Sequence, residues 1–180
     1  MLLTLSLSRL VLITILFSVA SYWLIAFQPT ARAFFTFIMW LFLDLLAAES
    51  LVVLLSSLVP VFVVALALVA FANGLWMAVG GFLVPLPQLN VFYRYVFHYI
   101  DYQAYVFQGM MVNEFRDRTY TCTGTACGYP TQGLDNTILG TTILQRYGYA
   151  LDKQGQWVGI MISIIVVYRL LGWLVMRFKA

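Results

Sequence analysis

Residues 10–31 read LVLITILFSVASYWLIAFQPTA and contain no charged side chain. A helix needs about 20 consecutive apolar residues to cross the hydrocarbon core of a bilayer. The run therefore predicts a transmembrane helix over about residues 10–27. A signal peptide is the alternative, because Arg9, the apolar run and the ARA sequence at 31–33 match its three regions. The apolar region of a signal peptide is usually about 7–15 residues long, so the longer run favours a membrane anchor.

The composition of the whole chain points to the same environment. The 180 residues are 63% hydrophobic and only 9% charged, whereas a soluble domain carries roughly 25% charged residues. The chain is therefore expected to be an integral membrane protein whose surroundings are membrane lipids. The net charge of +3 is small and scattered along the chain, which argues against a nucleic-acid partner.

Two further spans follow the first one. Residues 33–84 contain only two charged side chains, Asp44 and Glu49, and are too long for a single helix. The SSLVP sequence at 56–60 breaks this stretch, because proline cannot continue the helical hydrogen-bond ladder. The predicted spans are therefore about 33–56 and 60–84, the second ending near the glycines and prolines at 80, 81, 85 and 87.

The fourth predicted span is WVGIMISIIVVYRLLGWLVM at 157–176. Four spans place both chain ends on one side of the membrane. Arg9, Arg177 and Lys179 lie near those ends and favour a cytoplasmic location for them. The expected fold is all-α, with about four transmembrane helices, an interfacial aromatic helix and a structured extracellular loop, 85–156, before the last helix.

The long loop has an aromatic first part. Residues 92–107 read FYRYVFHYIDYQAYVF, which predicts a short helix at the membrane interface. A tyrosine-rich face packed against the other helices is a compatible alternative. His98 and Asp101 are three residues apart, close enough to interact on a helix. An acid–base pair would also need a nucleophile or a metal, and the sequence shows neither, so catalysis is not favoured.

The two cysteines, Cys122 and Cys127, lie in the polar second part of the loop, residues 113–156. Two cysteines and one histidine are too few for a four-ligand zinc site, and the spacing is not that of a redox CxxC motif. A short disulfide on the oxidising side of the membrane is the favoured interpretation. Two free thiols, or a bridge to a partner chain, are the alternatives.

Polar side chains also lie inside the predicted spans. Asp44 and Glu49 indicate an ion pathway, a proton relay or, as we favour, hydrogen bonds that fix helix packing. Arg169 either extends towards the membrane surface or pairs with one of these acids. Near the end of the third span, the small residues Gly74 and Gly80 allow close helix packing or leave room for a ligand.

Three stretches resemble the ABCG (White-type) ABC transporters. Residues 9–35, RLVLITILFSVASYWLIAFQPTARAFF, are similar to the third span and short outer loop of that family. VGGFLVPLPQL at 79–89 resembles the end of the fifth span. FHYIDYQAYVFQGMMVNEF at 97–115, followed by Cys122, resembles the last extracellular loop and is the most specific match. The resemblance covers essentially the whole chain.

The resemblance implies the third to sixth helices of an ABC type 2 membrane domain. Such domains work as homo- or heterodimers in the plasma membrane and export lipids, sterols or amphipathic xenobiotics. It implies a substrate cavity on the dimer axis, an apolar gate beyond it, and a disulfide in the loop that holds Cys122 and Cys127. The positions that correspond to the cavity are Ala70, Phe71, Gly74 and Met77, and those of the gate are Phe82 and Leu83.

The chain departs from the family pattern at its amino-terminal side. The nucleotide-binding domain and the first two spans are absent, and the sequence contains no GxxxxGK[ST] phosphate loop. We therefore expect no cofactor and no enzyme activity in this chain, with ATP and Mg²⁺ bound only by the missing domain. Alternatives are a truncated, non-transporting subunit that associates with an intact transporter, and a membrane-embedded enzyme.

Overall fold

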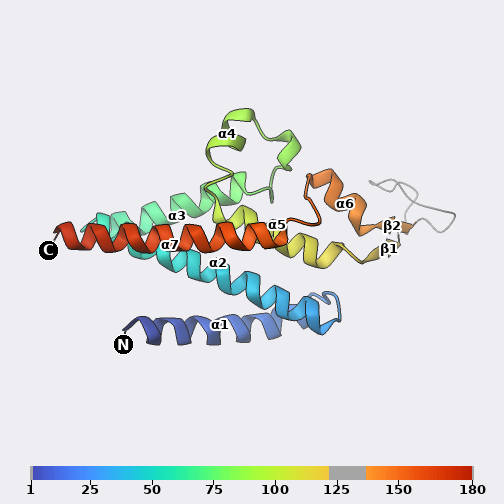
Figure 1. Cartoon of the computed structure of the whole chain (residues 1–180), viewed down its shortest axis with the longest axis horizontal. Helices are drawn as coiled ribbons and strands as arrows, with labels where there is room; N and C mark the ends of the chain where they lie inside the picture. The colour runs from blue at the N-terminus through green and yellow to red at the C-terminus, as the bar shows by residue number, and fades with distance from the viewer. Residues whose placement is uncertain (1, 122–136, 180) are drawn as a thin grey trace.

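The computed structural model describes residues 2–121 and 137–179. Figure 1 shows the long helices running along the long axis of the molecule, with the N- and C-terminal ends of the chain at the same end. We call this the terminal end and the opposite one the loop end. The prediction of an all-α membrane protein is confirmed. Within the described ranges, the helices long and apolar enough to cross a membrane are α1 (Leu2–Leu24, from Leu7 on), α2 (Ala31–Leu58), α3 (Phe62–Val79) and α7 (Gln154–Lys179).

Helix boundaries follow local capping chemistry. α1 ends at Leu24, three residues before the end of the predicted span, because the backbone turns at Ala26, which has a φ of 54°. The side chain of Thr30 then caps α2 by accepting a 3.4 Å hydrogen bond from the amide of Ala33. α3 stops at Val79 rather than near residue 84, because Gly81 adopts a φ of +94° that favours glycine.

α2 is the central helix of the bundle and packs against α1, α3, α5 (Tyr102–Phe115) and α7. Its buried residues recur every three or four positions, which places them on one side of the helix. This side meets α5 and α7 in the main hydrophobic cluster, to which α7 contributes Trp157, Met161 and Ile165. The cluster residues on α2 are Trp40, Leu43, Ala47 and Leu51.

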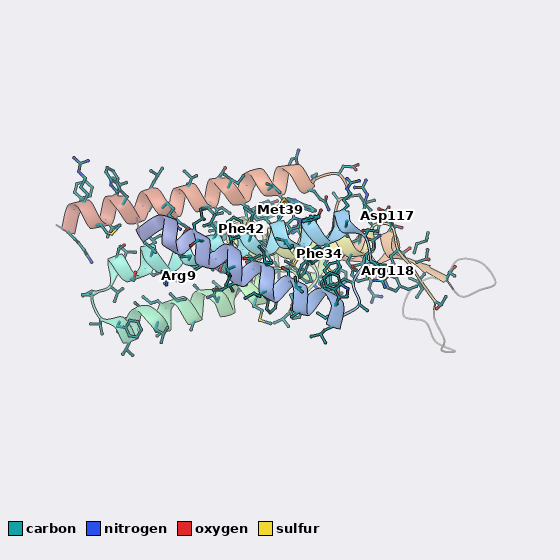
Figure 2. All side chains as sticks on the ribbon, turned by 90° about the horizontal axis from the view of Figure 1, so that it is seen from below. Arg9, Phe34, Met39, Phe42, Asp117 and Arg118 are labelled. Atoms are coloured by element: carbon teal, nitrogen blue, oxygen red, sulfur yellow. The ribbon has the colours of Figure 1, made fainter. Side chains whose placement is uncertain are left out.

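α1 lies along α2, as Figure 2 shows from below. Its buried side is formed by Thr14, Ser18 and Tyr22, which are spaced four residues apart. Small polar residues let two membrane helices approach closely, and Thr14 satisfies its hydroxyl by donating a 2.7 Å hydrogen bond to the carbonyl of Leu10. From Leu7 on, most of the large apolar side chains of α1 are exposed.

The aromatic segment 92–107 is not one helix, which corrects the prediction. α4 (Val91–Val96) ends, a turn follows, and Asp101 starts α5 by accepting a 2.8 Å hydrogen bond from the amide of Gln103. α4 stands off one side of the bundle (Figure 1) and its residues are exposed. α5 is instead buried among α2, α3 and α7, with Tyr102 fully shielded, so α5 packs inside the bundle.

The loop end carries the remaining elements. A 3₁₀ turn at Leu86–Gln88 precedes α4. β1 (Thr119–Thr121) and β2 (Thr137–Leu139) pair antiparallel with Tyr120 opposite Ile138, and α6 (Gly140–Tyr147) follows directly. The polar part of the loop is therefore structured where it is described. Cys122 and Cys127, and with them the predicted disulfide, lie outside the described residues.

Candidate functional site

The predicted cavity residues of α3 share one exposed side of that helix. Ala70, Phe71, Gly74 and Met77 fall within about a third of the helical circumference, given about 100° per residue, and all four are exposed. Phe71 is 70% exposed and Met77 is 50% exposed. A Cβ atom added at Gly74 would meet no atom within 4 Å. This side of α3 is therefore free to face lipid or a second membrane domain.

The predicted gate follows immediately, where the backbone turns away from α3. Gly80 fits tightly, since an added Cβ atom would lie 2.9 Å from Oδ2 of Asp101. Phe82 and Leu83, which follow Gly81, are 53% and 61% exposed. The ring of Phe82 meets that of Phe107 on α5 edge to face, with 5.5 Å between centroids. The gate position is thus fixed from one side by α5 and open on the other.

A polar network in the bundle interior links α3 to α5. The hydroxyl of Tyr102 donates a 3.0 Å hydrogen bond to Oδ1 of Asn73, and Nε2 of Gln103 donates to the same atom at 3.4 Å. Tyr102 is fully buried, so its hydroxyl needs such a partner. The sequence alone does not pair these residues. An asparagine in an apolar span is the signal that could have pointed to a buried partner.

His98 and Asp101 do not pair with one another. Nδ1 of His98 lies 3.2 Å from the carbonyl oxygen of Val79, so Nδ1 is the donor, and Nε2 accepts a 3.2 Å hydrogen bond from the amide of Gln108. Burial lowers the pKa of His98, which keeps the imidazole neutral at pH 7. Burial raises the pKa of Asp101 to about 7. His98 thus links the end of α3 to α5, whereas Asp101 caps the start of α5, and the two form no acid–base pair.

The polar side chains inside the spans have different surroundings. Arg169 donates to Oε2 of Glu49 at 2.8 Å and to Oγ of Ser50 at 2.9 Å, so Glu49 is the acid that it selects. This contact ties α7 to α2. Asp44 accepts no hydrogen bond from any residue in the described ranges, and its Oδ1 atom is shielded from solvent. The packing hydrogen bond expected of Asp44 is therefore not found among these residues.

The Asn113–Glu114–Phe115 sequence, which carried the most specific resemblance, closes the loop end. Nδ2 of Asn113 donates a 2.9 Å hydrogen bond to the carbonyl oxygen of Ala33. Glu114 accepts a 3.0 Å hydrogen bond from the amide of Gln28 and forms an ion pair with Arg118. The C-terminal end of α5 is thereby clamped to the α1–α2 turn, which makes the motif structural. In the described part of the chain, no three His, Cys, Asp or Glu side chains are grouped to hold a metal ion.

Comparison with known proteins gives the family. Residues 2–115 match the ABC-2 type transporter family. The chain is 28% identical over 173 residues to ABC transporter G family member 23 of Arabidopsis thaliana, which covers 95% of this chain and 26% of that protein. It is 27% identical over 168 residues to member 5 of the same plant, which covers 93% of this chain and 25% of that protein. A similar match, at 28% identity over 151 residues, is to ABC transporter G family member 1 of Dictyostelium discoideum.

These relatives agree with the resemblance found in the sequence. The chain spans about a quarter of the length of the two plant proteins. The family match, residues 2–115, covers the spans α1, α2 and α3 and also α5. It therefore includes the exposed side of α3, the gate and the polar network. The chain is an integral membrane protein that belongs to the ABC-2 type transporter family.

Proposed function

We propose that this chain is part of the membrane domain of an ATP-driven exporter of the ABCG type, which moves lipids, sterols or amphipathic xenobiotics. ATP and Mg²⁺ would bind to a separate nucleotide-binding domain, and this chain would supply part of the pathway. The chain would work in the plasma membrane as a homo- or heterodimer with another such domain. Its termini would be cytoplasmic and the loop end extracellular.

The exposed side of α3 carries this proposal. An apolar helix side that holds Phe71 and Met77, and that no described helix covers, is suited to a dimer axis. The side leads directly to the exposed residues Phe82 and Leu83 at the Gly80–Gly81 turn. An amphipathic molecule held beside Phe71 would therefore meet these two side chains on its way to the loop end.

Cross-linking in membranes tests the dimer. A chain that carries Gly74→Cys, with Cys122 and Cys127 changed to serine, is oxidised in the membrane and examined on a non-reducing gel. We expect a dimer band, because nothing within 4 Å covers this position. Val166→Cys on the exposed side of α7 is the matched control and should give little dimer. Dimer formation at position 166 but not at 74 would contradict the proposed axis.

Transport is tested in a chimera in which residues 1–180 replace the matched segment of ABC transporter G family member 23. Uptake of a fluorescent phospholipid into inside-out vesicles should depend on ATP. Phe71→Ala should change the range of transported molecules, and Phe82→Ala should raise uptake without ATP. Phe178→Ala, which changes another exposed phenylalanine at the terminal end, is the control. Unchanged uptake in both test variants would argue against the cavity and the gate.

A further inference from the structure

An open pocket of about 280 Å³ lies between α2, α3 and α5. Its lining includes Met77 from the exposed side of α3, together with residues of α2 and α5. Most of its lining is apolar, with Leu41, Trp76 and Phe107 among the contributing side chains. Asp44 on α2 and Gln103 on α5 supply the polar part of the lining. The pocket thus combines an apolar body with one acidic group.

Asp44 is an acid that has no hydrogen-bond or ion-pair partner among the described residues. Neither of its carboxylate oxygens takes part in a hydrogen bond or ion pair with a residue in the described ranges. The nearby base is already engaged, because Arg169 is bound to Glu49 and Ser50. None of the residues that line the pocket is basic. An unpaired carboxylate at membrane depth is costly and by default indicates a missing partner.

The surroundings of Asp44 add negative rather than positive charge. Asp101 is fully buried and interacts electrostatically with Asp44. Its Oδ2 atom also lacks a hydrogen bond from the described residues. Tyr102 is neutral, since burial and the two acids raise its pKa, and His98 is neutral because burial lowers its pKa. A cation that enters this pocket therefore meets the acid of Asp44, with Asp101 close enough to interact with it, and no basic side chain in the lining.

The apolar part of the lining is suited to the apolar body of an organic cation. Phe82 and Phe107 meet edge to face, which leaves aromatic surface along the pocket. Trp76 supplies an indole ring, the aromatic group that attracts cations most strongly. Its Nε1–H is shielded and has no acceptor in the described part of the chain.

We propose that this pocket binds an organic ammonium ion with an apolar body, its charge at the carboxylate of Asp44 and its body against Trp76, Phe82 and Phe107. That the bound cation is also exported rests on the proposed function, whereas binding itself does not. The pocket lies within one protomer, so a single chain holds all of these groups.

Three probes that share a phenylbutyl group and differ in the charge of their end group distinguish binding through charge from binding through apolar contact. 4-Phenylbutylammonium, 4-phenylbutanol and 4-phenylbutanoate are dialysed against the whole chain in lipid nanodiscs, and empty nanodiscs give the background from the lipid. We expect the ammonium to bind about tenfold more tightly than the alcohol, as a charge-assisted contact to a shielded carboxylate requires. The carboxylate probe should bind more weakly than the alcohol. Equal binding of the ammonium and the alcohol would overturn the proposal.

Two variants test whether the ammonium group binds at the carboxylate of Asp44. Asp44→Asn should lower the affinity for the ammonium to that for the alcohol and leave the alcohol within about threefold of the original value. Glu49→Gln removes the other acid of α2, which does not line the pocket, and should keep the preference for the ammonium. A preference that persists in Asp44→Asn, or disappears only in Glu49→Gln, would place the charge elsewhere and refute the proposal.

A third variant covers the case in which Asp44→Asn does not fold, as judged by size-exclusion chromatography. Leu41→Trp fills the pocket without changing its charge and should abolish binding of both the ammonium and the alcohol. Unchanged binding in Leu41→Trp would overturn the proposal. If the original chain fails to prefer the ammonium while the chimera still transports lipid, the proposed function stays in place and only the ammonium site is removed. If the original chain binds the ammonium but the chimera transports no lipid, the proposed function is removed and the ammonium site stays in place.

Discussion

Nη2 of Arg169 on α7 lies 2.8 Å from Oε2 of Glu49 on α2, and Nε of the same guanidinium donates to Ser50. The two helices come from opposite ends of the sequence, and this contact joins them at membrane depth. The hydroxyl of Ser50 donates in turn to the carbonyl of Leu46, so each of its hydrogen-bonding roles is used. The charge of Arg169 is thus matched inside the protein.

Glu49→Gln should therefore destabilise the fold, because it leaves Arg169 without a counter-charge. We expect a loss of about 1–3 kcal/mol in the free energy of unfolding in mixed micelles, less than for a fully shielded pair. Both side chains are about a quarter to a third exposed, which moderates the effect. The double variant Glu49→Leu/Arg169→Met should recover most of the loss. A single variant as stable as the original chain would show that the ion pair contributes nothing.

Gly109 allows α5 to approach α2. A Cβ atom at this position would overlap the indole ring of Trp40, which is fully buried and has no room to move. Gly109→Ala should lower the free energy of unfolding by at least about 1–3 kcal/mol, as overpacking in a core does. Gly159→Ala on α7 is the matched control, since an added Cβ atom there meets nothing within 4 Å. Equal stability of the two variants would contradict this packing.

Asp101→Asn should change how stability depends on pH. Burial raises the pKa of Asp101 from 3.8 to about 7 in the folded chain, so the folded state holds this proton more tightly than the unfolded state does. The stability that this group contributes is complete below about pH 4 and is lost as the pH rises to about 7. Asparagine keeps the helix cap without the charge. We expect the variant to gain stability relative to the original chain as the pH rises from 5 to 8.

Unfolding in mixed micelles at several pH values measures this difference. His98 titrates in the opposite sense, because its lowered pKa removes stability as the pH falls. It is present in both proteins, so the difference between them reports Asp101. A constant difference across this pH range would show that Asp101 does not titrate there.

Glu114→Ala should loosen the loop end. The side chain accepts a hydrogen bond from the amide of Gln28 and pairs with Arg118. Hydrogen exchange at the Gln28 amide should rise about tenfold, which corresponds to a loss of about 1.4 kcal/mol in local opening. Asp117→Ala removes a neighbouring exposed acid, labelled beside Arg118 in Figure 2, and should leave the exchange rate unchanged. Equal rates in both variants would mean that Glu114 does not secure the turn.

The sequence predicts the spans well because length and apolar content are local properties. Residues 10–31 and 157–176 each carry enough apolar residues to define a helix without knowledge of any neighbour. The split of the aromatic segment was missed, because tyrosines continue at helical spacing across it. Asp101 was the available signal, since aspartate is a frequent N-cap and directly precedes α5.

The arrangement of the candidate site could not be predicted in the same way. The choice of Glu49 over Asp44 as the partner of Arg169 depends on how α7 is rotated against α2, across 120 positions of sequence. The contact of Tyr102 with Asn73 likewise needs the fold of α5 back into the bundle. Such contacts arise from tertiary packing, which residue spacing within one helix does not encode.

The unequal lengths of α2 and α3 couple this protein to the thickness of its membrane. At 1.5 Å per residue, the 28 residues of α2 measure about 42 Å and the 18 residues of α3 about 27 Å. A hydrocarbon core of about 30 Å is shorter than α2 and slightly longer than α3. α2 must tilt or protrude, whereas α3 has no length to spare. Bilayer thickness should therefore set the angle between these helices, and lipid composition would tune the shape of whatever they enclose.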